Sequence, residues 1–167
     1  MPEDPTTTAT GEEPSAADRV ADAVSIASDF GIAWVALCAL QVLTGRRGAA
    51  EALRRLAAAG FTSLALTRIL KHHFGIDRDV AAVEGLRARA PSSSRFPSGH
   101  TLAAFAAAMA LPRTTAGRLG ATAAATTVAW SRVRVGHHRP EDVAAGAIVG
   151  AVAGAGLSVL LDRLDGS

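Results

Sequence analysis

Side chains able to bind an anion and to transfer protons are concentrated in two stretches of the chain. The first stretch contains Lys71, His72, His73, Arg78, Ser98 and His100. The second contains Ser131, Arg132, Arg134, His137, His138, Arg139, Glu141 and Asp142. Arginines alone are compatible with a positively charged rim. Together with serine and several histidines, they predict an anion site equipped with acid–base groups.

Three motifs within these stretches have a characteristic order and spacing. They are Lys71 followed after six residues by Arg78, the run Pro97-Ser98-Gly99-His100, and Ser131-Arg132 followed by His138 and Asp142. This set resembles the three-part signature of the type 2 phosphatidic acid phosphatase superfamily, which also includes bacterial class A acid phosphatases and vanadium haloperoxidases. The family pattern is Lys, six residues, Arg-Pro; then Pro-Ser-Gly-His; then Ser-Arg, five residues, His, three residues, Asp. Asp79 stands where the family has proline, but every charged or nucleophilic position is kept.

The spacing of His138 and Asp142 suits a nucleophilic histidine. Residues four apart at the start of a helix share a face. We therefore expect the carboxylate to hold one ring N–H of His138, which leaves the other nitrogen as the nucleophile. The resemblance implies that His138 attacks phosphorus and forms a phosphohistidine. It also implies that His100 protonates the leaving oxygen and then activates the hydrolytic water.

The remaining motif residues are suited to binding the phosphate. Ser98 and Gly99 are expected at a helix N-terminus, where backbone N–H groups favour an anion and glycine permits close approach. The resemblance implies that Lys71, Arg78 and Arg132 bind the nonbridging oxygens and stabilise their charge in the transition state. This scheme requires neither a metal ion nor a cofactor.

Other interpretations of the same region are plainer or compete with this one. His72 and His73 match no motif position and are expected to be interfacial polar residues, while Arg134 and Arg139 are expected at the rim or against lipid head groups. Cys38 is expected to pack within a helix. A rival interpretation is a metal site, with ligands drawn from His100, His137, His138, Glu141 and Asp142. That site would place three positively charged side chains, Lys71, Arg78 and Arg132, around a metal cation, and their mutual repulsion disfavours it.

The elements that must position these residues are predicted to be helices. The chain has 167 residues, of which 49% are hydrophobic and 19% charged, and this composition suits one packed domain. Its single cysteine excludes an intramolecular disulfide, and a net charge of +2 does not indicate nucleic acid binding. A mobile polar tail is expected over residues 1–17, ahead of a single transmembrane phosphatase domain, 18–167. Helices are expected over residues 18–29, 30–43, 49–73, 97–112, 116–135 and 140–164.

Long runs without charge predict that these helices lie in a membrane. Val143 to Leu161 is an uninterrupted apolar stretch of 19 residues, near the length of about 20 that spans a bilayer. We therefore expect an all-α, membrane-embedded bundle of about five transmembrane helices; a soluble bundle of alanine-rich helices is the alternative. Gly146, Gly150 and Gly154, spaced by four, are expected to let another helix approach closely.

The distribution of arginine orients the expected bundle. Two connectors on one side carry Arg46, Arg47, Arg54, Arg55, Arg113 and Arg118, whereas the N-terminal tail is acidic. The positive-inside rule then places the N-terminus and the two motif-bearing connectors on the extracytoplasmic side of the cell membrane.

These expectations describe an integral membrane phosphatase that hydrolyses the phosphomonoester or diphosphate of a lipid. Small bacterial members of the family act on phosphatidate, phosphatidylglycerophosphate, undecaprenyl diphosphate or decaprenylphosphoryl-ribose 5-phosphate. The alanine- and arginine-rich composition resembles that of high-GC bacterial proteins, which favours a polyprenyl lipid of envelope synthesis. The expected partners are this lipid and the bilayer, and the sequence indicates no oligomeric state. A soluble acid phosphatase or haloperoxidase-like enzyme and a non-catalytic membrane protein remain the alternatives.

Overall fold

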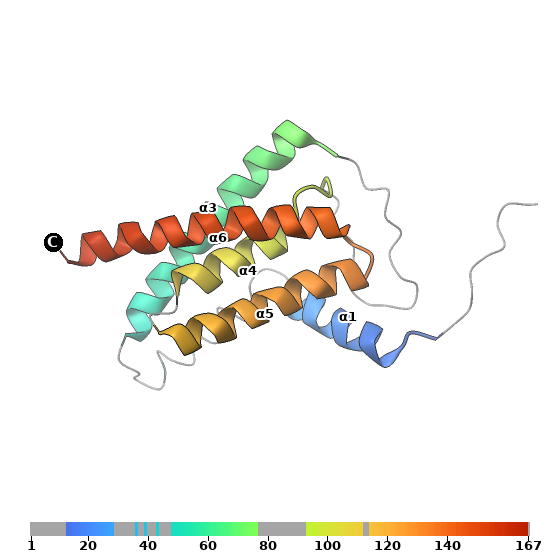
Figure 1. The fold of residues 1–167 in the computed structure, drawn as a ribbon, viewed down its shortest axis with the longest axis horizontal. Helices are drawn as coiled ribbons and strands as arrows, with labels where there is room; N and C mark the ends of the chain where they lie inside the picture. The colour runs from blue at the N-terminus through green and yellow to red at the C-terminus, as the bar shows by residue number, and fades with distance from the viewer. Residues whose placement is uncertain are drawn as a thin grey trace, which may run out of the picture.

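The chain folds into helices that run back and forth, as Figure 1 shows. The structure is a computed structural model that describes residues 13–28, 36, 39, 43, 48–76, 93–111 and 114–166. Within these ranges it contains α1 (Ala16–Ser28), α3 (Ala49–Phe74), α4 (Gly99–Ala110), α5 (Thr115–Arg134) and α6 (Pro140–Asp165), and no strand. The expected all-α class is therefore confirmed for the described part of the chain.

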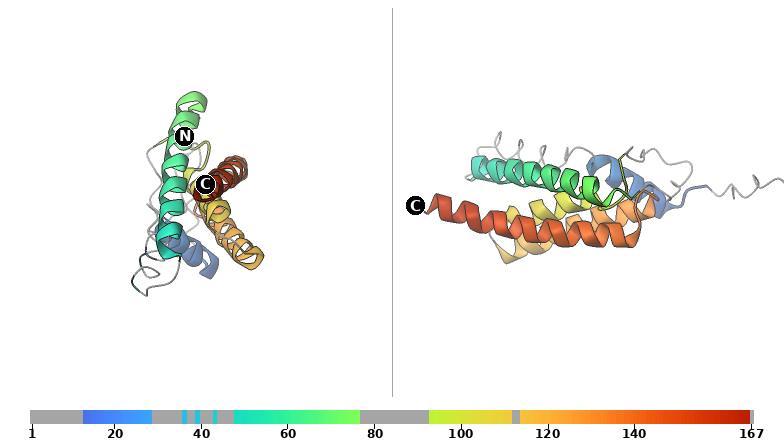
Figure 2. Two further views of the ribbon diagram at one scale, coloured as in Figure 1. Left: turned by 90° about the vertical axis from the view of Figure 1, so that its left-hand side faces the viewer. Right: turned by 90° about the horizontal axis from the view of Figure 1, so that it is seen from above.

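Helix α4 is the centre of the arrangement. It contacts α3, α5 and α6, and seven of its twelve residues are buried. The core around it is made of small side chains, with Ala104 and Ala108 of α4 packed against Ala125 and Val128 of α5. Alanine allows helix axes to approach closely, so the short α4 is enclosed by longer neighbours (Figure 2).

A row of glycines on α6 sets the distance between α6 and α4. A Cβ atom added at Gly146 would lie 2.6 Å from the carbonyl oxygen of Ser98. Cβ atoms added at Gly150 and Gly154 would come even closer to the backbone of Leu102 and Ala106. The expected close approach is therefore confirmed, and its partner is α4.

Helix ends bring the three motifs to the same end of the bundle. Helix α3 ends at Gly75, whose φ of 39° is left-handed, one turn after Lys71. Helix α4 begins after its N-cap residue Ser98, and α6 begins with Pro140 in its first turn. These ends lie together on the right of Figure 1, opposite the C-terminus of α6.

The predicted helix bounds agree with the structure to within about two residues for every described helix. The helix expected over 30–43 falls almost entirely outside the described residues, and so does Arg78. One expected position is wrong, because Pro97 precedes the N-cap of α4 instead of lying in its first turn. The backbone turns at the cis Phe96–Pro97 bond before the helix starts.

Only α6, among the described helices, is both long and apolar enough to cross a bilayer. Its 26 residues include a window of mean hydropathy 2.1, whereas the apolar α4 has only 12 residues. Large apolar side chains are exposed on other helices too, including Phe61 on α3 (75%) and Leu119 on α5 (68%). The described helices thus include one clear candidate span, and the expected membrane bundle of about five spans stays a prediction.

Candidate active site

Residues of all three motifs meet around one cavity. The cavity has a volume of about 760 Å³, and its lining includes Lys71 from α3, Gly99 and His100 from α4, and His138 from the loop before α6. His100 is half-buried, and His138 is 2% exposed. The predicted nucleophile, the predicted acid–base group and one predicted phosphate-binding cation therefore line the same cavity.

His138 and Asp142 are neighbours, but not for the predicted reason. His138 lies outside α6, one residue before the N-cap Arg139, so the two residues do not share a helix face. Asp142 instead caps the helix: its Oδ2 accepts a hydrogen bond from the Arg139 backbone N–H at 2.9 Å. The same Oδ2 lies 3.7 Å from Nδ1 of His138. The capping interaction thus turns the carboxylate toward the imidazole.

The start of α4 is bound to the start of α6. The Ser98 backbone N–H donates to the Asp142 carbonyl oxygen at 3.0 Å, and the Ser98 hydroxyl accepts from Thr101 Oγ1 at 3.0 Å. A Cβ added at Gly99 would lie 3.0 Å from Cγ2 of Thr67 on α3. Gly99 is therefore required by helix packing, in addition to the phosphate approach that the sequence suggested.

Two of the predicted phosphate-binding cations are held by hydrogen bonds. Lys71 Nζ donates to Ser93 Oγ at 3.0 Å and also to the Ser94 carbonyl oxygen, which ties the connector before α4 to α3. Arg132 is 1% exposed, and its Nη1 donates to Ser25 Oγ of α1 at 2.5 Å. Arg78, the third predicted cation, lies outside the described residues.

A second interaction, between Asp18 and Arg134, joins α1 to the C-terminal end of α5. Arg134 Nε lies 2.7 Å from Asp18 Oδ1. A hydrogen bond from the Ser15 hydroxyl lowers the pKa of Asp18, and the Arg134 charge acts in the same direction. Nothing in the sequence motifs indicated that α1 would reach this site.

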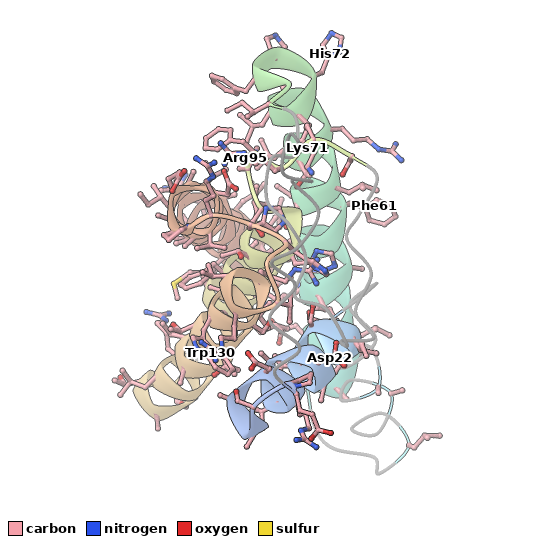
Figure 3. The ribbon with its side chains drawn as sticks, turned by 90° about the vertical axis from the view of Figure 1, so that its right-hand side faces the viewer. Asp22, Phe61, Lys71, His72, Arg95 and Trp130 are labelled. Carbon is pink, nitrogen blue, oxygen red and sulfur yellow. The ribbon has the colours of Figure 1, made fainter. Side chains whose placement is uncertain are left out.

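The histidines outside the motif pattern lie in two separate places. His72 and His73 are exposed at the end of α3, where Figure 3 shows His72 pointing away from the other helices. His137 is buried at 1% exposure, and its backbone N–H donates to the Arg132 carbonyl oxygen at 3.0 Å, as does that of His138 at 3.1 Å. His137 is therefore part of the turn that carries His138.

Arg95 is the site residue that sequence reasoning missed. It belongs to none of the three motifs, yet its Nη1 lies 2.6 Å from Asp142 Oδ1. Its place directly before the Phe96-Pro97-Ser98 run was the signal that could have found it.

The rival metal site is not assembled by the described residues. No three His, Cys, Asp or Glu side chains among them come close enough to hold a metal ion. Of the five proposed ligands, Asp142 already uses both oxygens, on Arg95 and on the Arg139 N–H.

Comparison with known proteins identifies the family. The profile of the PAP2 superfamily matches residues 52–164, a range that contains every motif residue. The chain belongs to the PAP2 superfamily. Among solved structures it is similar to Aquifex aeolicus LpxE, with a TM-score of 0.67, 23% sequence identity, and coverage of 90% of this chain and 88% of that one. No curated protein matches the chain.

The PAP2 match agrees with the geometry of the site, because the motif residues that line the cavity all lie within the matched range. The superfamily profile covers α3 to α6 almost completely but leaves out α1. The bonds from α1 to Arg132 and Arg134 therefore join a helix outside the matched range to two residues within it.

Proposed function

We propose that this chain is a membrane phosphatase that hydrolyses a lipid phosphate or diphosphate through a phosphohistidine intermediate. The observation that carries the proposal is the shared cavity, in which His138, His100 and Lys71 line one wall in a PAP2 superfamily member.

The chemistry proceeds in two displacements. Nε2 of His138 attacks phosphorus as the bond to the leaving lipid oxygen breaks, and His100 gives that oxygen a proton. His100 then takes a proton from water, whose oxygen attacks phosphorus and breaks the N–P bond, releasing inorganic phosphate. Lys71, Arg78, Arg132 and the N-terminus of α4 at Ser98 and Gly99 stabilise the phosphoryl charge in both steps. Asp142 Oδ2, which lies 3.7 Å from Nδ1 of His138, favours the tautomer with its N–H on Nδ1 and so leaves the Nε2 lone pair for the attack.

The cavity supports a lipid substrate. Its lining includes a run of large apolar side chains, Leu53, Leu56, Phe61 and Leu64 of α3. Lys71 and Leu53 are 18 residues apart on this helix, which corresponds to about 27 Å at a rise of 1.5 Å per residue. A phosphate at Lys71 would thus have an apolar surface for its chain along α3.

The surface supports a bilayer environment. Ile148 and Val152 on α6 are 66% and 70% exposed, whereas many of the buried positions hold alanine, glycine, serine or arginine. Small and polar residues between helices with large apolar residues outside are typical of membrane bundles. We place the active site on the extracytoplasmic side, as the positive-inside rule predicts.

A phosphate-release panel tests the function. Purified protein is given phosphatidate, phosphatidylglycerophosphate, undecaprenyl diphosphate and decaprenylphosphoryl-ribose 5-phosphate, with the His138→Ala variant as the blank. We expect release from at least one lipid, unchanged by excess EDTA and inhibited by vanadate, which adopts the five-coordinate geometry of phosphoryl transfer. Activity that is lost on chelation and restored by a divalent ion would favour the metal interpretation. No release from any lipid would favour a non-catalytic protein.

A further inference from the structure

Arg95 is a buried cation that contacts the carboxylate of the proposed catalytic pair. Its side chain is 10% exposed, and its Nη1 lies 2.6 Å from Oδ1 of Asp142, which is fully buried. The Arg95 backbone N–H donates to the Ile76 carbonyl oxygen at 3.0 Å, so the main chain is also held, just beyond the end of α3. Figure 3 shows Arg95 at the same end of the bundle as Lys71.

The two oxygens of Asp142 have different partners. Oδ1 faces Arg95, while Oδ2 accepts from the Arg139 N–H and faces Nδ1 of His138 at 3.7 Å. A guanidinium on one oxygen fixes the rotation of the carboxylate, because turning it would break a charge-assisted hydrogen bond inside the protein. Arg95 and the helix cap together therefore keep Oδ2 of Asp142 on the side of His138.

The charge of Arg95 also bears on the proton of His138. A buried carboxylate beside an imidazole favours the protonated ring, and a protonated ring has no lone pair with which to attack phosphorus. Other charged or titratable groups around the pair come from each neighbouring element: Lys71 on α3, His100 on α4, Arg132 on α5, His137 in the loop, and Glu141 on α6. Glu141 is 59% exposed and lies 3.8 Å from Arg95, so its charge is screened by solvent.

We propose that Arg95 is a positioning residue for the nucleophile, whose guanidinium orients and partly neutralises the Asp142 carboxylate so that His138 stays unprotonated near neutral pH. The inference rests on the proposed function. It adds an arginine outside the three motifs to the catalytic arrangement, through its effect on Asp142.

The pH dependence of kcat/KM distinguishes this role from a structural one. Arg95→Gln removes the charge, and Arg95→Lys keeps it with fewer donors. In wild type, kcat/KM should rise on the acidic side of the pH profile as His138 loses its proton. We expect this acidic limb to lie about one pH unit higher in Arg95→Gln, so that kcat/KM at low pH is about tenfold below wild type and returns to the wild-type value at higher pH. Arg95→Lys is expected to keep the wild-type limb with kcat lowered by less than about tenfold, since it loses only geometry.

Arg139→Gln is the matched control. It removes the same charge from the same end of the molecule, but its side chain is 45% exposed and lies 4.0 Å from Glu141. Its limb is expected to stay at the wild-type position. Thermal unfolding of each variant, in the detergent used for the assay, separates lost activity from lost folding.

Each possible result bears on the proposal. An Arg95→Gln variant whose kcat/KM falls equally at every pH would overturn it in favour of a structural role. If Arg95→Gln does not fold, Arg95→Lys decides, because a moved acidic limb in a variant that keeps the charge would contradict the electrostatic part. An inactive wild-type protein would instead remove the proposed function and this inference together.

Discussion

Asp142 combines a structural and a chemical task in one carboxylate. It caps α6 through the Arg139 N–H, binds Arg95, and lies 3.7 Å from the His138 ring. A helix start is a well-defined place to hold a carboxylate, since the cap fixes its rotamer without further packing. The chemistry of His138 thus depends on the same bonds that begin the helix.

Substitutions at Asp142 are expected to separate these two tasks. Asp142→Asn keeps an oxygen for the cap but loses the negative charge, so we expect activity to fall about 10³–10⁴-fold and stability to fall because Arg95 loses its buried counter-charge. Asp142→Ala loses the cap in addition, which costs about a further 0.5–2 kcal/mol. Phosphate release and thermal unfolding measure the two effects. Equal stability of the two variants would show that the cap is unimportant.

At the scale of elements, the α4–α6 contact aligns the site. The glycines of α6 let its backbone meet that of α4, and this contact brings Ser98 to Asp142. The α3 helix joins the same assembly through Thr67 against Gly99. A small change of helix separation would therefore move the phosphate-binding N-terminus of α4 relative to His138.

Two glycines of α6 provide a matched test of this contact. A Cβ at Gly150 would meet the Leu102 carbonyl group, whereas a Cβ at Gly156 would meet nothing within 4 Å. Gly150→Ala is expected to cost about 1–3 kcal/mol through overpacking and to lower kcat. Gly156→Ala is expected to be neutral or to stabilise by up to about 1 kcal/mol, because alanine favours helix. Comparable unfolding temperatures for both variants would contradict the proposed alignment.

Adjacent arginines at the far end of α3 provide a second matched pair. Arg55 is 2% exposed and binds Glu51 at 2.9 Å, Asp162 at 2.5 Å and the Ala110 carbonyl oxygen at 3.3 Å, so it joins α3, α4 and α6. Arg54 pairs with Asp165 at the surface, with 47% of its side chain exposed. Arg55→Ala is expected to cost about 1.5–3 kcal/mol, because it removes charge-assisted hydrogen bonds to carboxylates that are themselves partly exposed to solvent.

The control Arg54→Ala is expected to cost less than about 1 kcal/mol, since exposed ion pairs contribute little. Denaturant unfolding measures both variants. A larger loss for Arg54→Ala would mean that the burial of Arg55 does not stabilise the contact between the three helices.

At the scale of the whole molecule, we propose that the exposed apolar faces lie against a bilayer, with the arginines indicating its orientation. Cysteine labelling in a Cys38→Ser background tests that orientation. The structure favours His72→Cys for the outer position, because His72 is exposed and points away from the other helices. We expect His72→Cys to react with an impermeant maleimide in intact cells, and Thr115→Cys to react only after permeabilisation. The opposite pattern would place the site in the cytoplasm.

The sequence predicted the described helices and singled out the motif residues. It did not predict the interactions that depend on tertiary contacts. The resemblance of the spaced motifs to a known family pointed to His138, His100 and Asp142, and apolar runs with helix breakers predicted the bounds of α3 to α6. The spacing of four suggested a shared helix face, although His138 precedes the helix predicted over 140–164; a capped loop and a helix turn place residues four apart at similar distances. Arg95 and Ser25 were missed for a related reason: their partners are distant in the chain, and their residue types are common on surfaces.

The central claim is that His138 carries the phosphoryl group, and trapping that group tests it most directly. Protein mixed with a hydrolysed lipid and quenched at alkaline pH, where phosphohistidine survives, is digested and mapped by mass spectrometry. The account predicts one added phosphoryl group on His138 in the wild type and in His137→Ala, and neither adduct nor turnover in His138→Ala. A phosphoryl group on His137 or another residue, or turnover by His138→Ala, would contradict the account.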